Sequence, residues 1–191
     1  MYYTCRVRNS PYALEPEAFL RAIDATRATL GEARMKLLDI VDRVRELTDD
    51  APYAVIGGLA QILWARKSHT DDLHVALASA DLVKAYERTS GGGSVVDLIT
   101  FADEEFTREV IQSARPAPEL GGIRFVRPEL LLVTHLLRPT VEAKLAAVEL
   151  LIARRDEATF DMAYARAWAA RVGAEPAFDR IRELAQRFAD I

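Results

Sequence analysis

The 191-residue chain is 50% hydrophobic and 28% charged, which suits one globular domain or a domain with a helical extension. Its formal net charge of −4 gives no overall attraction to a nucleic acid, although a local basic patch remains an open alternative. The single cysteine, Cys5, excludes an internal disulfide, and no apolar run approaches the ~20 residues of a membrane span. The first segment, "MYYTCRVRNS", lacks the apolar core of a signal peptide, so we expect a cytoplasmic protein with no membrane contact.

Residues 1–50 have the pattern of an N-terminal helical pair. Apolar residues recur three and four apart between Glu15 and about Asp50, as in the series Leu38, Val41 and Val44. A glycine at position 31 lies where one helix would give way to a second.

Residues 51–127 mix short strands with helices. The segments "YAVIGG", "LHVAL", "SVVDLITF" and "GIRFV" are apolar or alternating and predict strands. The segments "LAQILWARK" and "DEEFTREVIQSA" have helical spacing, and "SGGGS" is a short connection before a strand. This order predicts an α+β fold with a mixed sheet and flanking helices.

Residues 128–191 are helical throughout, so we expect an α-helical C-terminal half. Pro128 and Pro139 lie where new helices would open. The last helices carry an apolar face, including "WAARV" and "LAQRF", which predicts packing against the core, a protein partner or a second copy of the chain.

Strand parity brings polar residues together in the middle region. Within "DLHVAL", Leu73, Val75 and Leu77 share one face and are expected to point into a core. The opposite face then carries Asp72 and His74.

The next strand, "VVDLI", places Asp97 among apolar neighbours, where a carboxylate is costly without a partner or a metal. Asp72 and Asp97 facing one cleft would suit a divalent cation and a phosphate. Gly57 and Gly58, between a strand and a helix, would let a phosphate approach the backbone closely.

The stretch "VIGGLAQILWARKSHTDDLHV", followed by "VVDLI", resembles the nucleotidyltransferase fold of the polymerase-β-like superfamily. It is most similar to the small bacterial branch that includes the AbiEii-type toxins, over about residues 50 to 155. The pattern is an apolar strand, Gly-Gly, a helix, Thr-x-Asp-apolar-Asp-apolar and a third Asp on a later strand. The matching residues here are Gly57, Gly58, Thr70, Asp72 as the first acid and Asp97 as the third.

The resemblance implies transfer of a nucleotidyl group from an NTP to a hydroxyl group. The first two acids of the pattern would hold two Mg²⁺ ions, and the third would position or deprotonate the hydroxyl. In this chain the implied metal ligands are Asp72, His74 and Asp97, with Asp72 and Asp97 in the catalytic roles. Gly57, Gly58 and Thr70 would contact the nucleotide phosphates.

The sequence departs from this pattern at several positions. His74 replaces the second acid, and His135 lies where the following helix usually offers a lysine. Leu145 and Val148 replace two further acids, and Ser68 replaces an arginine. Because Mg²⁺ prefers oxygen ligands, while neutral imidazole suits zinc, manganese or iron, a two-magnesium site is weakened. These departures are typical of a relaxed active site.

Two functions therefore stay open. The first is a divergent nucleotidyltransferase, using Mn²⁺ or Mg²⁺, that modifies an RNA, a protein or a small molecule. The second is an inactive module on the same fold that keeps a nucleotide pocket or only a protein-interaction surface. His74 also has a structural explanation, as a buried histidine satisfied by the backbone. The arginines Arg124 and Arg127 either flank a phosphate pocket or lie on the solvated side of an edge strand.

Overall fold

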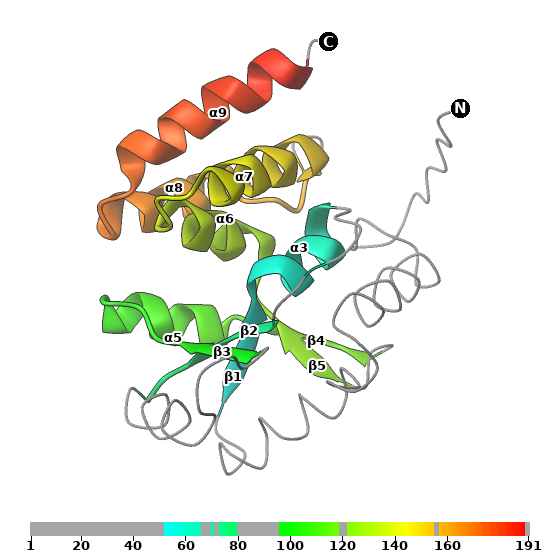
Figure 1. Cartoon of the computed structure of the whole chain (residues 1–191), viewed down its shortest axis with the longest axis vertical. Helices are drawn as coiled ribbons and strands as arrows, with labels where there is room; N and C mark the ends of the chain where they lie inside the picture. Colours follow the sequence, from blue (N-terminus) through cyan, green and yellow to red (C-terminus); the bar gives the residue numbers. More distant parts are fainter. Residues whose placement is uncertain are drawn as a thin grey trace.

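The computed structural model describes residues 52–65, 70, 73–79, 96–118, 122–154 and 157–189. The expected N-terminal helical pair lies outside these residues. Within them the fold is α+β, as expected, with a mixed sheet and a helical C-terminal half (Figure 1). The elements are β1 (Tyr53–Ile56), α3 (Gly57–Ala65), β2 (Leu73–Leu77), β3 (Val96–Ile99), α5 (Glu104–Gln112), β4 (Arg115–Ala117), β5 (Ile123–Phe125), α6 (Pro128–Leu136), α7 (Val141–Arg154), α8 (Met162–Arg171) and α9 (Glu175–Ala189).

The described strands form one sheet in the order β3-β2-β1-β5-β4. β1 is antiparallel to β2 and parallel to β5, while β2 and β3 are parallel. The expectation that "LHVAL" and "VVDLI" are neighbours is therefore confirmed. β1 is buried along its whole length, as its position inside the sheet requires.

The sequence did not predict β4. This strand has three residues, "RPA", and runs antiparallel to β5 with Pro116 opposite Arg124. Proline cannot donate a ladder hydrogen bond, so it is confined to edge strands, and it makes a short strand look like a loop. β4 is indeed at one edge of the sheet.

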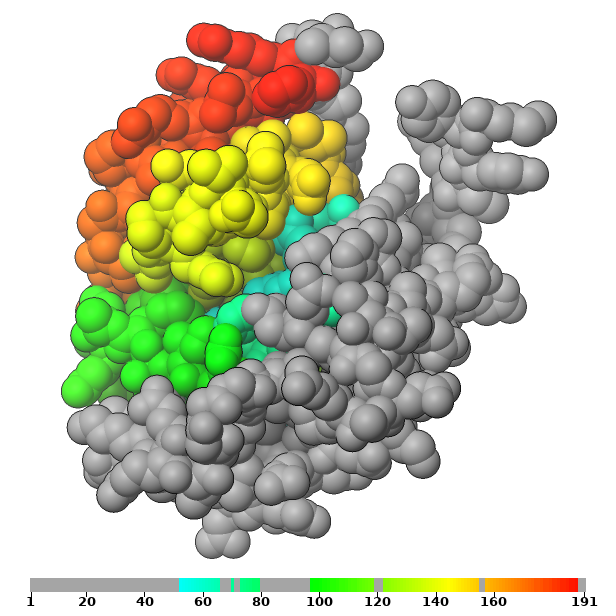
Figure 2. Space-filling model, in the orientation of Figure 1, coloured from blue at the N-terminus to red at the C-terminus, as the bar shows by residue number. Residues whose placement is uncertain are grey.

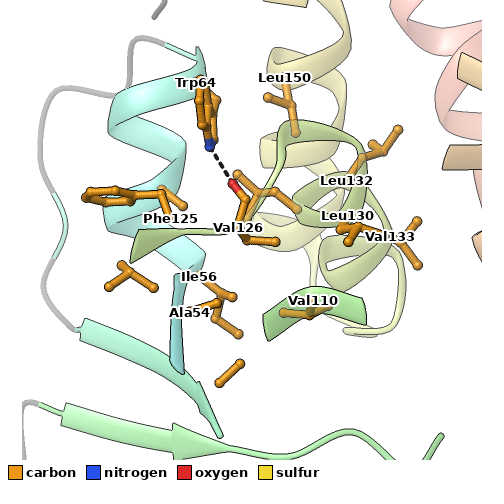
Figure 3. Packing of buried hydrophobic residues seen from close by; sticks show 14 of the residues in the cluster. Ala54, Ile56, Trp64, Val110, Phe125, Val126, Leu130, Leu132, Val133 and Leu150 are labelled. Carbon is orange, nitrogen blue, oxygen red and sulfur yellow. Dashed lines mark hydrogen bonds between the residues drawn. The ribbon is translucent and has the colours of Figure 1, made fainter. Parts of the chain in front are cut away.

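Helix α3 follows β1 directly and joins the sheet to the helical half. Figure 3 shows the indole of Trp64 reaching the main chain of Val126, where its N–H donates to the carbonyl oxygen at 2.8 Å. Gln61 donates from Nε2 to the carbonyl of Ala146 on α7 at 2.8 Å. Two buried polar contacts thus fix this helix against segments that come much later in the chain.

Helix α6 is apolar on nearly all sides, "PELLLVTHL", and every residue from Pro128 to His135 is buried. An all-round apolar helix belongs in a protein interior. It contacts α3, α7 and α8, and α7 in turn contacts α9. Pro128 occupies the first turn, as the sequence predicted.

Helices α7 and α9 pack on one another, whereas α5 packs on the sheet. On the face drawn in Figure 2, α9 (red to orange) lies beside α7 (yellow), with α5 (green) below them. Asp103 caps α5 by accepting a hydrogen bond from the Phe106 amide at 2.7 Å, which explains why this helix begins at its acidic turn. None of the described helices is long and apolar enough to cross a membrane.

Candidate functional site

His74 and Asp97 are the two predicted site residues that the structure brings into contact. They are register partners in the parallel ladder of β2 and β3. The imidazole Nε2 lies 3.3 Å from the carboxylate Oδ2, and the side chains are 6% and 58% exposed, respectively. The pair therefore joins a buried ring to a carboxylate that solvent reaches.

Gly57 forms the other wall around the His74 ring. Ile56 is the register partner of His74, so the glycine that follows it comes over the same side chain. Gly57 has a φ of 65°, and a Cβ built on it would lie 2.6 Å from Nδ1 of His74. The left-handed conformation and the close approach both require glycine at this position. The His74 imidazole ring therefore occupies the space that a side chain at position 57 would need.

Two features of the described residues bear on the expected cleft. First, β2 is an inner strand of the sheet and is buried along its whole length, including His74 and Ala76. His74 therefore does not line an open cleft. Second, Asp97 is more than half exposed, whereas its apolar neighbours predicted an enclosed carboxylate. Its strand, β3, ends the order of described strands and leaves this side chain open to water.

The other predicted residues are only partly placed. Asp72 lies outside the described residues, so the expected Asp72–Asp97 separation remains a prediction. Thr70 is buried, and Gly58 is half-buried next to Gly57. Over the described ranges, no cluster of three or more His, Cys, Asp or Glu residues could hold a metal ion. His74 and Asp97 nevertheless offer one nitrogen and one oxygen atom that a single cation could share.

His135 has a packing role on α6. Its side chain is buried, and Nε2 lies 3.1 Å from Oε1 of Gln61. Because the Gln61 amide nitrogen already donates to Ala146, its oxygen must accept from His135. The ring therefore donates through Nε2–H and links α6 to α3.

The two positions where acids were replaced differ in their surroundings. Leu145 on α7 is 58% exposed, whereas Val148 on the same helix is buried. A carboxylate at position 145 would face solvent, and one at position 148 would have to be enclosed.

A buried polar network at the start of α6 was not predicted. Glu129, 1% exposed, accepts a hydrogen bond from the Asp161 amide at 3.0 Å and lies 3.3 Å from Nε of Arg127. The Arg127 guanidinium also stacks over the Tyr164 ring, whose hydroxyl donates to Glu109. Burial, followed by the Glu109 interaction, raises the pKa of the Tyr164 hydroxyl.

Arg124 and Arg154 also make structural contacts. Arg124 donates from Nη2 to the carbonyl of Ala114 at 2.8 Å. Arg154 is buried over the ring of Trp64 and pairs with Glu157. Burial lowers the pKa of its guanidinium, and the Glu157 charge opposes that shift. The only sequence signal for this network was the Arg-Pro-Glu spacing at residues 127–129, because the other partners come from distant helices.

Comparison with known proteins adds no relative on which to place this site. No family model, no curated protein and no solved structure matches the chain. The role of the His74–Asp97 pair is therefore argued from its geometry and from the sequence resemblance.

Proposed function

We propose that this chain is a nucleotidyltransferase-fold protein that binds a nucleotide beside Gly58 and Asp97 and has lost efficient magnesium-dependent transfer. One observation carries the proposal. The two positions that correspond to the second and third acids of the resemblance, 74 and 97, are register partners on parallel strands. A nucleotidyltransferase site needs these two positions on one face of a sheet, next to a strand–Gly-Gly–helix turn.

The order of elements supports the same proposal. A buried strand, β1, leads into Gly57 and Gly58, which begin α3. The helix N-terminus offers amide groups to an anion, and Gly58 is more exposed than Gly57. A phosphate would therefore contact the turn at Gly58, because the His74 ring already lies against Gly57.

Loss of transfer follows from the chemistry of His74. An imidazole has one metal-binding nitrogen that faces Asp97, so it cannot bridge two cations as a carboxylate does. Replacing the second acid by His74 also removes one of the negative charges that would balance the charge of Mg²⁺. Exposed Leu145 and buried Val148 supply no replacement acid.

Nucleotide binding and transfer must be measured separately. Binding of ATP and GTP by calorimetry should be detectable with the wild-type chain and weakened by Asp97→Asn and Asp72→Ala. The matched control is Glu142→Gln, which removes an exposed carboxylate from the first turn of α7. Transfer of labelled nucleotide with Mg²⁺ or Mn²⁺ should stay near background. Absence of binding with every nucleotide and cation would contradict the proposal.

A second candidate, the protein-interaction module, is favoured by one observation. α9 leaves Leu184 and Phe188, one helical turn apart, 40% and 58% exposed. The candidate is a contact through α9 with a second copy or another protein. Sedimentation velocity of the wild type and of Phe188→Glu tests self-association; a monomer at all concentrations would remove the second copy as the partner.

A further inference from the structure

We propose that the His74–Asp97 pair binds one zinc-class cation, with tetrahedral geometry, in preference to Mg²⁺. The role of the cation, which is to hold a nucleotide phosphate, rests on the proposed function. The binding of the cation itself rests only on the geometry of the two side chains.

The donor set favours this class of metal. An imidazole nitrogen and a carboxylate oxygen are common zinc ligands, whereas Mg²⁺ takes oxygen ligands almost exclusively. Nε2 of His74 and Oδ2 of Asp97 face each other across the ladder. A cation between them would exchange one protein–protein contact for two metal–ligand bonds.

The separation of the donors favours the same geometry. Zinc bonds of about 2.0–2.1 Å at a tetrahedral angle place two ligand atoms about 3.3–3.4 Å apart. Magnesium bonds of similar length at a right angle place them only about 2.9–3.0 Å apart. The observed separation of Nε2 and Oδ2 is 3.3 Å. Zinc would fit at this separation with little movement, whereas magnesium would require the two donor atoms to come a few tenths of an ångström closer.

The two residues are suited to complementary tasks. The His74 ring is fixed, because it is buried and lies against the Gly57 backbone. Asp97 is open to solvent, so a cation can reach the pair from that side. Zinc binding requires Nε2 without its proton, and that proton leaves to solvent or is carried on Nδ1 instead.

Two protein ligands leave two tetrahedral positions open. Catalytic zinc sites keep such a position for water or substrate. In this chain Asp97 is exposed to solvent, so a phosphate oxygen could take such a position from that side. The cation would thus join a nucleotide to the protein without a second metal.

The test uses the full chain with Zn²⁺, Co²⁺ or Mg²⁺ alone, in a Cys5→Ser background that removes the thiol as a competing ligand. Calorimetry should show a zinc site, and Co²⁺ should give the strong visible absorption of tetrahedral cobalt. Mg²⁺ at the same concentration should give neither heat nor competition. His74→Gln, which keeps a polar group facing Asp97, and Asp97→Asn should each weaken zinc binding by about tenfold or more. Glu142→Gln should bind as the parent does.

Unchanged zinc affinity in Asp97→Asn would overturn the inference, and so would Mg²⁺ binding as tight as Zn²⁺ binding. Asp97 is on the exposed edge, so this variant stays informative even if His74→Gln fails to fold. Nucleotide binding is then measured with zinc and with a chelator. Zinc binding without nucleotide binding would contradict the proposed function alone, whereas nucleotide binding without a zinc site would contradict this inference alone.

Discussion

His74 and Asp97 are direct register partners of β2 and β3, and their side chains meet at 3.3 Å between Nε2 and Oδ2. In a parallel ladder such partners project to the same face of the sheet. The contact therefore follows from the two strands being neighbours in this register. The same register would bring two carboxylates together if position 74 carried an acid.

The first prediction uses that register. His74→Asp should destabilise the metal-free protein by about 2–3 kcal/mol, because it places a second carboxylate in a buried position facing Asp97. Mg²⁺ should restore part of this loss, since it neutralises both charges. Thermal unfolding with a chelator and with Mg²⁺ measures both effects.

Turnover of His74→Asp should stay near zero, because positions 135, 145 and 148 still lack the residues of the resemblance. Robust Mg²⁺-dependent transfer by the wild type, abolished by Asp72→Ala, would show that the histidine is compatible with catalysis.

The second prediction concerns Gly57. Gly57→Ala should cost about 1–2 kcal/mol for the left-handed backbone and about 1–3 kcal/mol more for the contact with the His74 ring. Gly173→Ala is the matched control, since Gly173 has a φ of 75° with nothing within 4 Å of a built Cβ. Denaturant unfolding of both variants separates strain from steric overlap.

A double-mutant cycle sharpens this comparison. Adding His74→Ala to Gly57→Ala should recover the steric part of the loss, whereas adding it to Gly173→Ala should be additive. Equal costs for the two glycine variants would mean that the imidazole does not occupy the space over Gly57.

The third prediction concerns the buried carboxylate of Glu129. Glu129→Gln should lower the free energy of unfolding by about 2 kcal/mol, because it weakens the contacts with Arg127 and the Asp161 amide. Glu142→Gln, at an exposed helix start, should change it by less than about 1 kcal/mol. Equal effects in urea unfolding would argue against a structural role for the network.

The fourth prediction is a pH dependence. Burial and Glu109 raise the pKa of Tyr164 above its usual value of about 10, so the folded state favours the neutral hydroxyl. Its contribution is complete below about pH 10 and is lost as the pH rises further. Urea unfolding should find Tyr164→Phe less stable than the wild type by about 1 kcal/mol at pH 7. The difference should shrink above pH 10, and a constant difference would contradict this assignment.

Much of the sheet could be predicted because its information is local. The strands β1, β2, β3 and β5 are short apolar runs, and the expectation that "LHVAL" and "VVDLI" are neighbouring strands is confirmed. β4 could not be predicted, since three residues containing Pro116 carry no alternating signal.

The surroundings of the site depend on contacts that no local pattern encodes. The His74 ring lies against the backbone of Gly57, and β2 itself is packed by α3, which precedes it in sequence, and by α5, which follows it. The Glu129 network similarly joins α6 to the start of α8, so strand parity could not reveal it. Parity predicted that Asp72 and Asp97 face one cleft, which stays a prediction, and the contact of His74 with Asp97 was not predicted.

The position of β1 has a consequence for protein synthesis. One edge of β1 pairs with β2, which follows it closely in sequence, and its other edge pairs with β5, where Val55 partners Phe125. At a synthesis rate of about 5–20 residues per second, several seconds pass between the synthesis of Val55 and that of Phe125. During that time β1 is an apolar strand with one unpaired edge, which is the kind of segment that chaperones bind. The central strand of the described sheet is thus made well before β5, the strand that covers its second edge.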